Sequence, residues 1–216
     1  GQAPYAESVQ GAINRLNTMA QEVVARCSDT MLAAVGYSQG AHAVSNWAKN
    51  VGAGQNRVPA SRVAAVATFG DPDRQTGAGL FPGADGQTSP SPIPGAAGTS
   101  VTRVTVSSAP APTGGGIAPS STQQMGYGQL TGRVASFCET GDLACDAPAD
   151  APITHILTNV AGSSELNPDV PVAAITSVAE ATALMTIKAA PTIINEDFTS
   201  DDGTLASLNY TPQETV

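Results

Sequence analysis

The 216-residue sequence is poor in positive charge, in aromatic side chains and in long apolar runs. Its nine Lys and Arg residues are scattered and outnumbered by 18 Asp and Glu residues, which argues against a nucleic-acid partner because phosphate binding needs clustered cations. Aromatic residues make up only 4% of the chain, so no stacking platform for single strands is visible. No apolar run approaches the roughly 18 residues of a membrane span, and the sequence predicts one soluble globular domain.

Cysteine and histidine are equally scarce. The three cysteines, Cys27, Cys138 and Cys145, form no Cys-x-x-Cys motif, and His42 and His155 are not at metal-ligand spacing with them, so we expect no metal site and no cofactor. The close pair Cys138 and Cys145 is typical of a disulfide loop, which favours a secreted or cell-envelope location. The chain begins abruptly with Gly-Gln-Ala-Pro and no signal peptide, so we expect a processed or truncated product.

Hydrophobic periodicity predicts that helices and buried strands alternate in the first third of the chain. Apolar residues recur every three or four positions over residues 7–26 and again over 41–50, which indicates two amphipathic helices. Short apolar runs at 31–35 and 62–69 indicate strands buried on both faces, and 132–137 is a third strand candidate.

The long stretch between the second and third strands is rich in Gly, Pro, Ser, Thr and Ala. It extends from about residue 74 to residue 132, contains the tri-glycine 114–116, and alternates apolar with polar residues only at 100–107. Loops of this length are usually functional or disordered.

The sequence predicts a main domain over residues 1–190 and an acidic, irregular tail over 191–216. Residues 171–190 close the domain with an apolar segment that has a helical pattern.

The motif Gly36-x-Ser38-x-Gly40 matches a nucleophile elbow. In this turn a strand passes sharply into a helix, the Ser backbone is strained, and its hydroxyl projects at the top of a sheet. Chance alone gives about 0.2 matches to the bare pattern in a chain this long, so a Gly-rich turn that happens to hold a Ser is an alternative. The predicted strand before the motif and the predicted helix after it favour a nucleophile.

A serine nucleophile needs a base, and two histidines compete for this role. His42 lies four residues after Ser38 on the predicted helix, beneath the hydroxyl, where it cannot approach from the substrate side, so we expect it to be structural. His155 lies after the third strand in a segment broken by prolines, and it alone permits the α/β-hydrolase order of Ser, acid and His.

Asp142 is the favoured acid because Cys138 and Cys145 bracket it directly after the third strand. A disulfide that closes so small a ring would stabilise the fold by roughly 2 to 3 kcal/mol and hold the carboxylate in place. Asp71 also follows a strand, but Pro72 behind it favours a turn-capping role. Three other acids remain alternatives, each also explained as a solvated loop charge: Glu139, Asp146 and Asp150.

Taken together, these motifs resemble the cutinase family of serine esterases. The resemblance rests on five features: Gly-Tyr-Ser-Gln-Gly-Ala at 36–41, Cys27 ahead of the nucleophile strand, Phe69-Gly70 at the end of the next strand, the Cys-x-x-Gly-Asp-x-x-Cys block at 138–145, and His155. Tyr5, Ser8 and Phe-Gly-Asp-Pro at 69–72 are closest to the actinobacterial branch. The resemblance extends from about residue 3 to residue 190 and is interrupted by the insertion at 74–132.

The resemblance implies an α/β fold, a three-layer α/β/α sandwich with a central parallel sheet. It also implies a secreted serine carboxylic ester hydrolase, whose substrate is a small-molecule, lipid or polyester ester. Ser38 would be the nucleophile, Asp142 the orienting acid, His155 the general base, and the backbone amide of Gln39 one oxyanion donor.

The sequence departs from the family pattern at its front. Family members begin with one or two strands that carry a Cys paired with the position of Cys27 and a Ser or Thr loop that supplies the other oxyanion donor. Neither feature is present, so we expect an N-terminal segment that this chain lacks. Without it, the nucleophile strand would expose an apolar parallel edge, and catalysis would be about 100-fold to 1000-fold slower.

Two other functions use the same motifs. A catalytically weak binding or envelope protein is favoured by the missing front and by the low-complexity insertion. An acyltransferase or a lipase of cell-envelope lipids would share the triad.

Overall fold

The computed structural model describes residues 5–98, 101–104, 111–118, 125–148, 198–200 and 208–210. The chain divides into two compact units, Ala6–Pro148 and Gly1–Tyr5 together with Ala149–Val216. His155 and the predicted helix at 171–190 lie outside the described residues, and the predicted boundary at residue 190 stays a prediction.

In the second unit the structure describes one antiparallel strand pair. Strand β4 (Phe198–Ser200) pairs with β5 (Leu208–Tyr210), so the tail that the sequence predicts to be irregular contains short regular structure. The acidic composition of the tail did not reveal these two three-residue strands, which are shorter than the usual periodicity window.

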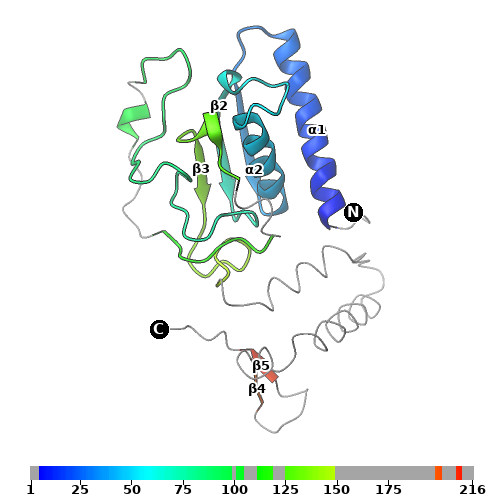
Figure 1. Cartoon of the computed structure of the whole chain (residues 1–216), viewed down its shortest axis with the longest axis vertical. Helices are drawn as coiled ribbons and strands as arrows, with labels where there is room; N and C mark the ends of the chain where they lie inside the picture. Colours follow the sequence, from blue (N-terminus) through cyan, green and yellow to red (C-terminus); the bar gives the residue numbers. More distant parts are fainter. Residues whose placement is uncertain are drawn as a thin grey trace. The chain divides into compact units, whose positions relative to one another are not determined.

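The first unit contains a parallel sheet of three strands, as the sequence predicts. Strand β1 (Leu32–Tyr37), β2 (Val63–Phe69) and β3 (Val134–Phe137) lie in the order β1-β2-β3. Helix α2 (Gln39–Gly52) returns the chain from the end of β1 and packs against both β1 and β2 (Figure 1). Because helix and strand alternate around a parallel sheet, the α/β class is confirmed.

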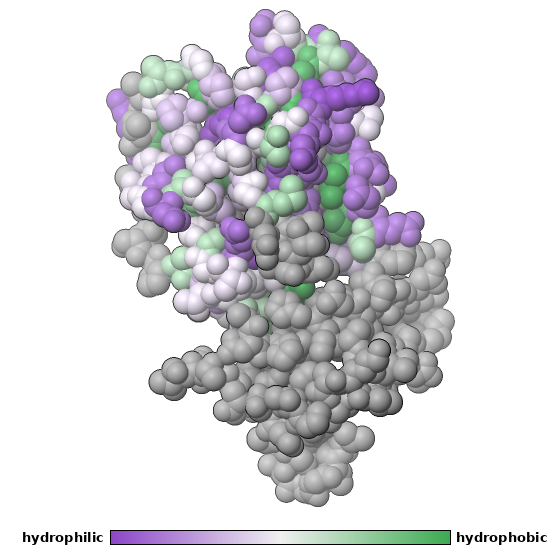
Figure 2. All heavy atoms as spheres, in the orientation of Figure 1, coloured by the Kyte–Doolittle hydropathy of each residue, from purple (hydrophilic) through white to green (hydrophobic). Residues whose placement is uncertain are grey.

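Helix α1 (Tyr5–Arg26) lies beside α2 (Figure 1). Glu7 in its first turn and Arg26 in its last turn both suit the helix dipole. Val9 and Ala20 are buried, and Ala20 joins the apolar core formed by α2 and the sheet. The outer side of the helix is mixed: Figure 2 shows a strip of hydrophobic residues among hydrophilic ones in this region, and Met19 is 66% exposed.

The core lies between α2 and one face of the sheet. Ala34, Val66 and Val134 are partners in adjacent strands, and all three are buried on this face. Trp47 of α2 and Leu130 are buried with them. Leu130 belongs to a short 3-10 helix, η3 (Gly128–Leu130), which packs against α2. A second such helix, η1 (Ala60–Arg62), leads into β2.

The opposite face of the sheet is exposed in the described part of the chain. Tyr37, Phe69 and Phe137 are partners across the three strands, and their exposed fractions are 77%, 40% and 41%. Parallel sheets are normally covered on both faces, and this row of side chains is not covered by the described residues. No described helix supplies the expected third layer, and the full sandwich stays a prediction.

The described parts of the 74–132 insertion consist of turns, short 3-10 helices and one isolated β-bridge, between Gly115 and Ala147. Val101–Arg103 forms η2, in the segment whose alternation is typical of a strand. Local alternation is ambiguous over so few residues, because no neighbouring strand in the described part stabilises an extended conformation. None of the described helices is long and apolar enough to cross a membrane.

Candidate active site

Ser38 occupies the turn between β1 and α2. Its backbone angles are φ 52° and ψ −123°, and it is the one described residue other than glycine with a positive φ. Such a conformation costs about 1 to 3 kcal/mol and is found mainly at functional sites. The Ser38 side chain makes no capping hydrogen bond to the start of α2, so the hydroxyl is not used to cap the helix.

Gly36 permits the close approach of strand and helix that this turn requires. A Cβ atom at Gly36 would lie 2.4 Å from the carbonyl oxygen of Gly40 and 2.7 Å from Cα of Ala41. At Gly40, in contrast, an added Cβ would meet no described atom within 4 Å. The first glycine of the motif is therefore required by packing, and the second is not required by the described residues.

Backbone hydrogen bonds tie the ends of the three strands together. The N–H of Ser38 donates to the carbonyl oxygen of Phe69 at 2.9 Å, and the N–H of Gly70 donates to that of Phe137 at 2.9 Å. The carboxyl edge of the sheet is thus held as one unit around the serine, in the position where α/β proteins carry their sites.

Asp142 lies at the same edge. The predicted disulfide between Cys138 and Cys145 is formed, with Cα atoms 5.9 Å apart. A Cβ at Gly70 would lie 3.4 Å from Oδ2 of Asp142 and 3.9 Å from Cε2 of Tyr37, the residue before the serine. The other oxygen of Asp142, Oδ1, accepts a hydrogen bond from the N–H of Ala144 at 2.8 Å. The loop therefore holds one carboxylate oxygen and directs the other toward the ends of β1 and β2.

The alternative acids occupy different environments. Asp146 accepts hydrogen bonds from the N–H groups of Gly114 at 2.7 Å and Gly141 at 2.8 Å, so both of its oxygens hold loop backbone. Glu139 is exposed, and Asp150 lies outside the described residues. Asp71 caps a turn, as the sequence predicts, because its Oδ1 accepts a hydrogen bond from the N–H of Asp73 at 2.9 Å.

The structure describes one of the two candidate bases. His42 is 7% exposed on α2, and its backbone N–H donates to the carbonyl oxygen of Ser38 at 3.1 Å. Burial lowers the pKa of the imidazole, and the nearby Asp73 partly opposes that shift. A buried imidazole on α2 fits the structural role expected for it. His155 lies outside the described residues, and its role as the base stays a prediction.

Gln39 is the first residue of α2, where backbone N–H groups have no partner within the helix. Its side chain accepts a long hydrogen bond, 3.4 Å, from the hydroxyl of Ser8 on α1. The start of α1 is therefore anchored beside the serine, and the amide of Gln39 lies at the positive end of the α2 dipole.

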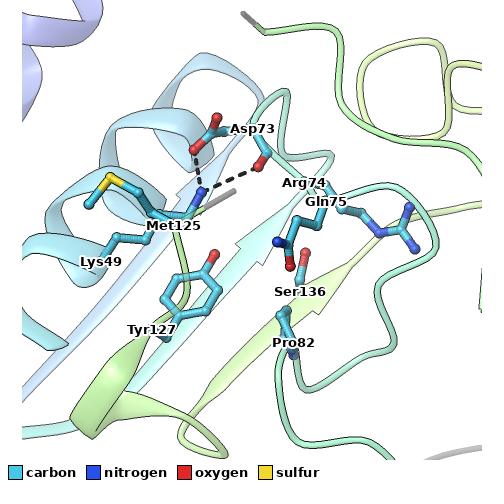
Figure 3. Close-up of a pocket in the computed structure, with 8 residues that line it drawn as sticks. All are labelled: Lys49, Asp73, Arg74, Gln75, Pro82, Met125, Tyr127 and Ser136. Atoms are coloured by element: carbon cyan, nitrogen blue, oxygen red, sulfur yellow. Dashed lines mark hydrogen bonds and ion pairs between the residues drawn. The ribbon is translucent and has the colours of Figure 1, made fainter. Parts of the chain in front are cut away.

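A buried polar cluster on α2, which the sequence did not predict, is formed by Ser45, Lys49, Asp73 and Tyr127. Nζ of Lys49 lies 2.5 Å from Oδ2 of Asp73, with both side chains almost fully buried (Figure 3). The hydroxyl groups of Ser45 and Tyr127 are 2.8 Å apart, and burial raises the pKa of Tyr127 well above its usual range. Helix α2 is thereby attached to the segment after β2. Only a polar stripe within a helix predicted to be amphipathic could have revealed it.

Asp71 is completely buried beside this cluster, and the Ser45 side chain is one of its hydrogen-bonding neighbours. Burial raises the pKa of its carboxyl to about 6, although the hydrogen bond from Asp73 opposes the shift. Within the described ranges, no group of three His, Cys, Asp or Glu side chains could hold a metal ion.

Comparison with known proteins identifies relatives of the chain. A sequence model described as Cutinase matches residues 1–165. A curated relative, the Carboxylesterase Culp6 homolog of Corynebacterium glutamicum, is 32% identical over 126 residues, which are 57% of this chain. The chain spans only 38% of the length of that relative.

One similar solved structure is that of an acetylxylan esterase. It is 19% identical in sequence, the match covers 77% of this chain and 71% of the other, and the TM-score is 0.39. At this level the similarity carries no argument about function.

Proposed function

Because the chain belongs to the cutinase family, we propose that it is a serine carboxylic ester hydrolase that works through an acyl-enzyme. The observation that carries the proposal is the backbone of Ser38, strained at a strand-to-helix turn with its hydroxyl free of capping. The curated relative supports the same reaction class, since it is named a carboxylesterase.

In the proposed mechanism His155 removes the proton of Ser38, whose oxygen attacks the carbonyl carbon of the ester. Asp142 orients the imidazole, and the amide of Gln39 donates a hydrogen bond to the oxyanion. The imidazolium then returns the proton to the departing alcohol, which leaves the acyl group on Ser38. Water, activated by the same imidazole, attacks the acyl-enzyme and releases the acid.

The surroundings of Asp142 support its assignment as the acid. Its Oδ2 lies close to Gly70, directly after β2, whereas both oxygens of Asp146 accept hydrogen bonds from loop backbone. The Cys138–Cys145 disulfide also supports a secreted or cell-envelope location, because disulfides persist in oxidising compartments.

The test is covalent labelling of the native protein by a fluorophosphonate probe, followed by hydrolysis of p-nitrophenyl esters of increasing chain length. We expect stoichiometric labelling at Ser38, and loss of both labelling and turnover in Ser38→Ala. A short-chain optimum would indicate an esterase or cutinase, and a long-chain optimum a lipase.

Absence of labelling under native conditions would reject the enzyme in favour of a binding protein with the same fold. Faster release of product when an alcohol or sugar is added, with formation of the transferred ester, would instead indicate an acyltransferase.

A further inference from the structure

The proposed mechanism leaves the tri-glycine of the long insertion without a role. A Cβ atom at Gly114 would lie 2.5 Å from the carbonyl oxygen of Ala147, and one at Gly116 would lie 2.0 Å from that of Pro72. Both obstacles are backbone atoms, which cannot move aside as a flexible side chain can. The segment therefore passes through a gap that only glycine fits.

Hydrogen bonds fasten the tri-glycine on both sides. On one side Gly115 and Ala147 exchange two backbone bonds, at 2.9 Å and 2.8 Å, just beyond the disulfide loop. On the other side the N–H of Gly116 donates to the carbonyl oxygen of Arg74 at 2.8 Å. The segment thus connects the disulfide loop to the residues that follow β2.

The side chain of Arg74 completes this connection. It is 3% exposed and points away from the Lys49–Asp73 pair (Figure 3). Its Nη1 donates to the carbonyl oxygens of Gly114 at 2.7 Å and Cys145 at 3.1 Å. Its Nη2 donates to two further carbonyl oxygens in the same insertion, those of Pro112 and Ala78.

Burial lowers the pKa of the Arg74 guanidinium, whereas Asp146 and Asp71 raise it. Arginine stays charged in proteins, so these are charge-assisted bonds in a rigid planar fork. Lysine offers no such fork, which makes the position sensitive even to a change that keeps the charge.

The position of Asp142 depends on both ends of its loop. The disulfide closes the loop on itself, but it does not fix how the loop is oriented toward Ser38. Strand β3 holds one end at Cys138, and Arg74 holds the other through Cys145. Cys145 in turn donates its N–H to the carbonyl oxygen of Asp142 at 3.2 Å.

We propose that Arg74, acting through the tri-glycine segment and Cys145, is a positioning residue that sets the orientation of Asp142 toward the base. The proposal rests on the proposed function, since it requires Asp142 to be the acid of the triad. Arg74 itself touches no reacting atom. The hydrogen bonds from Arg74 to Pro112, Gly114 and Cys145, which we call the brace, then hold the catalytic loop in place.

The first test compares Arg74→Lys with Arg103→Lys, which makes the same change at an exposed arginine of the insertion. We expect Arg74→Lys to lower kcat for p-nitrophenyl butyrate by about 10- to 100-fold with KM within about twofold, because small misplacements of a catalytic group reduce turnover strongly. The acid limb of the pH profile of kcat/KM should move to lower pH. The imidazolium loses its carboxylate partner, and this lowers the pKa of the base. Arg103→Lys should change neither quantity.

The second test is a double-mutant cycle with Asp142→Asn. If Arg74 acts through Asp142, Arg74→Lys should reduce the labelling rate of Ser38 by less than about twofold once Asp142 is already changed. Equal factors in both backgrounds, or an acid limb that does not move, would overturn the positioning role.

Hydrogen exchange tests the brace independently of any activity assay. Backbone hydrogen exchange of residues 139–147 should be about tenfold faster or more in Arg74→Lys, with β1 to β3 unchanged. If Arg74→Lys does not fold, Asp146→Asn weakens the same brace from the loop side and takes its place in all three tests.

Failure of this inference and failure of the proposed function are distinguishable. If hydrogen exchange in the loop is unchanged in Arg74→Lys, the brace is overturned, whether or not the wild type shows esterase turnover. Absence of Ser38-dependent turnover in the wild type would overturn the proposed function and the catalytic role of Arg74 with it, while faster exchange would still establish the brace.

Discussion

At the scale of single residues, the candidate site is best understood from the surroundings of three side chains, those of Ser38, Asp142 and His42. Ser38 is held by the backbone of the elbow, and its hydroxyl makes no capping bond. Asp142 offers one oxygen to Ala144 and directs the other toward the strand ends. His42 is buried on α2, and His155 stays the predicted base.

The assignment of the acid is tested by Asp142→Asn. We expect kcat to fall by about 1,000- to 10,000-fold, because an amide in place of the carboxylate favours the wrong imidazole tautomer. Glu139→Gln is the matched control, since Glu139 is exposed in the same loop and should leave kcat within about twofold. Steady-state kinetics together with circular dichroism make the comparison, and a small effect at Asp142 would assign the acid to another residue.

The buried carboxyl of Asp71 leads to a prediction of how the free energy of unfolding depends on pH. Burial disfavours the charged carboxylate and raises the pKa of this carboxyl from its ordinary value of 3.8 to about 6 in the folded chain. Between these values the folded state binds more protons. The contribution of Asp71 to the free energy of unfolding is therefore fully present below about pH 3.8 and is lost as pH rises through about 6. The loss is on the order of 2 to 3 kcal/mol.

Asp71→Asn removes this titration while keeping the oxygen that accepts from Asp73. Urea unfolding at several pH values should show that the free energy of unfolding declines less in Asp71→Asn than in the wild type between pH 4 and 7. Asp85→Asn, at an exposed carboxyl, should reproduce the wild-type slope. Parallel slopes for wild type and Asp71→Asn would contradict the buried carboxyl.

At the scale of elements, the elbow is set by the contact between β1 and α2. Gly36→Ala should lower the free energy of unfolding by more than about 2 kcal/mol, because its Cβ would lie against the backbone of Gly40 and Ala41. Gly40→Ala should be neutral or stabilising by up to about 1 kcal/mol, since no described atom obstructs its Cβ and Ala favours a helix. Denaturant titrations of the two variants give both values, and equal losses would contradict this account.

The same scale shows which elements can be predicted from sequence. Both helices and all three strands of the first unit lie where periodicity places them, within three residues at each end. Residues 100–107 are the exception, because a pattern without a neighbouring strand does not determine an extended conformation. The tri-glycine at 114–116 looks like low complexity in the sequence, and only its neighbours show why glycine is needed there.

At the scale of the whole molecule, one face of the sheet is packed and the other carries aromatic side chains at its carboxyl edge. Phe69 and Phe137 stack with ring centroids 4.7 Å apart, and Tyr37 continues the row. Tyr37 and Phe69 are the last residues of β1 and β2, so the row lies directly before Ser38 and Gly70 in the chain. The expected third layer would cover it, and the described part of the chain leaves it open.

The α/β class, the turn at Ser38 and the disulfide that brackets Asp142 could be predicted before folding was known, because they depend on local periodicity and on residues close together in the chain. The glycines that packing requires, the pairing of Lys49 with Asp73 and the hydrogen bond from Arg74 to Cys145 are visible only in the folded chain. Those contacts join residues 24 and 71 positions apart. Burial, which alters the pKa of Asp71, is a property of the assembled core and of no single segment.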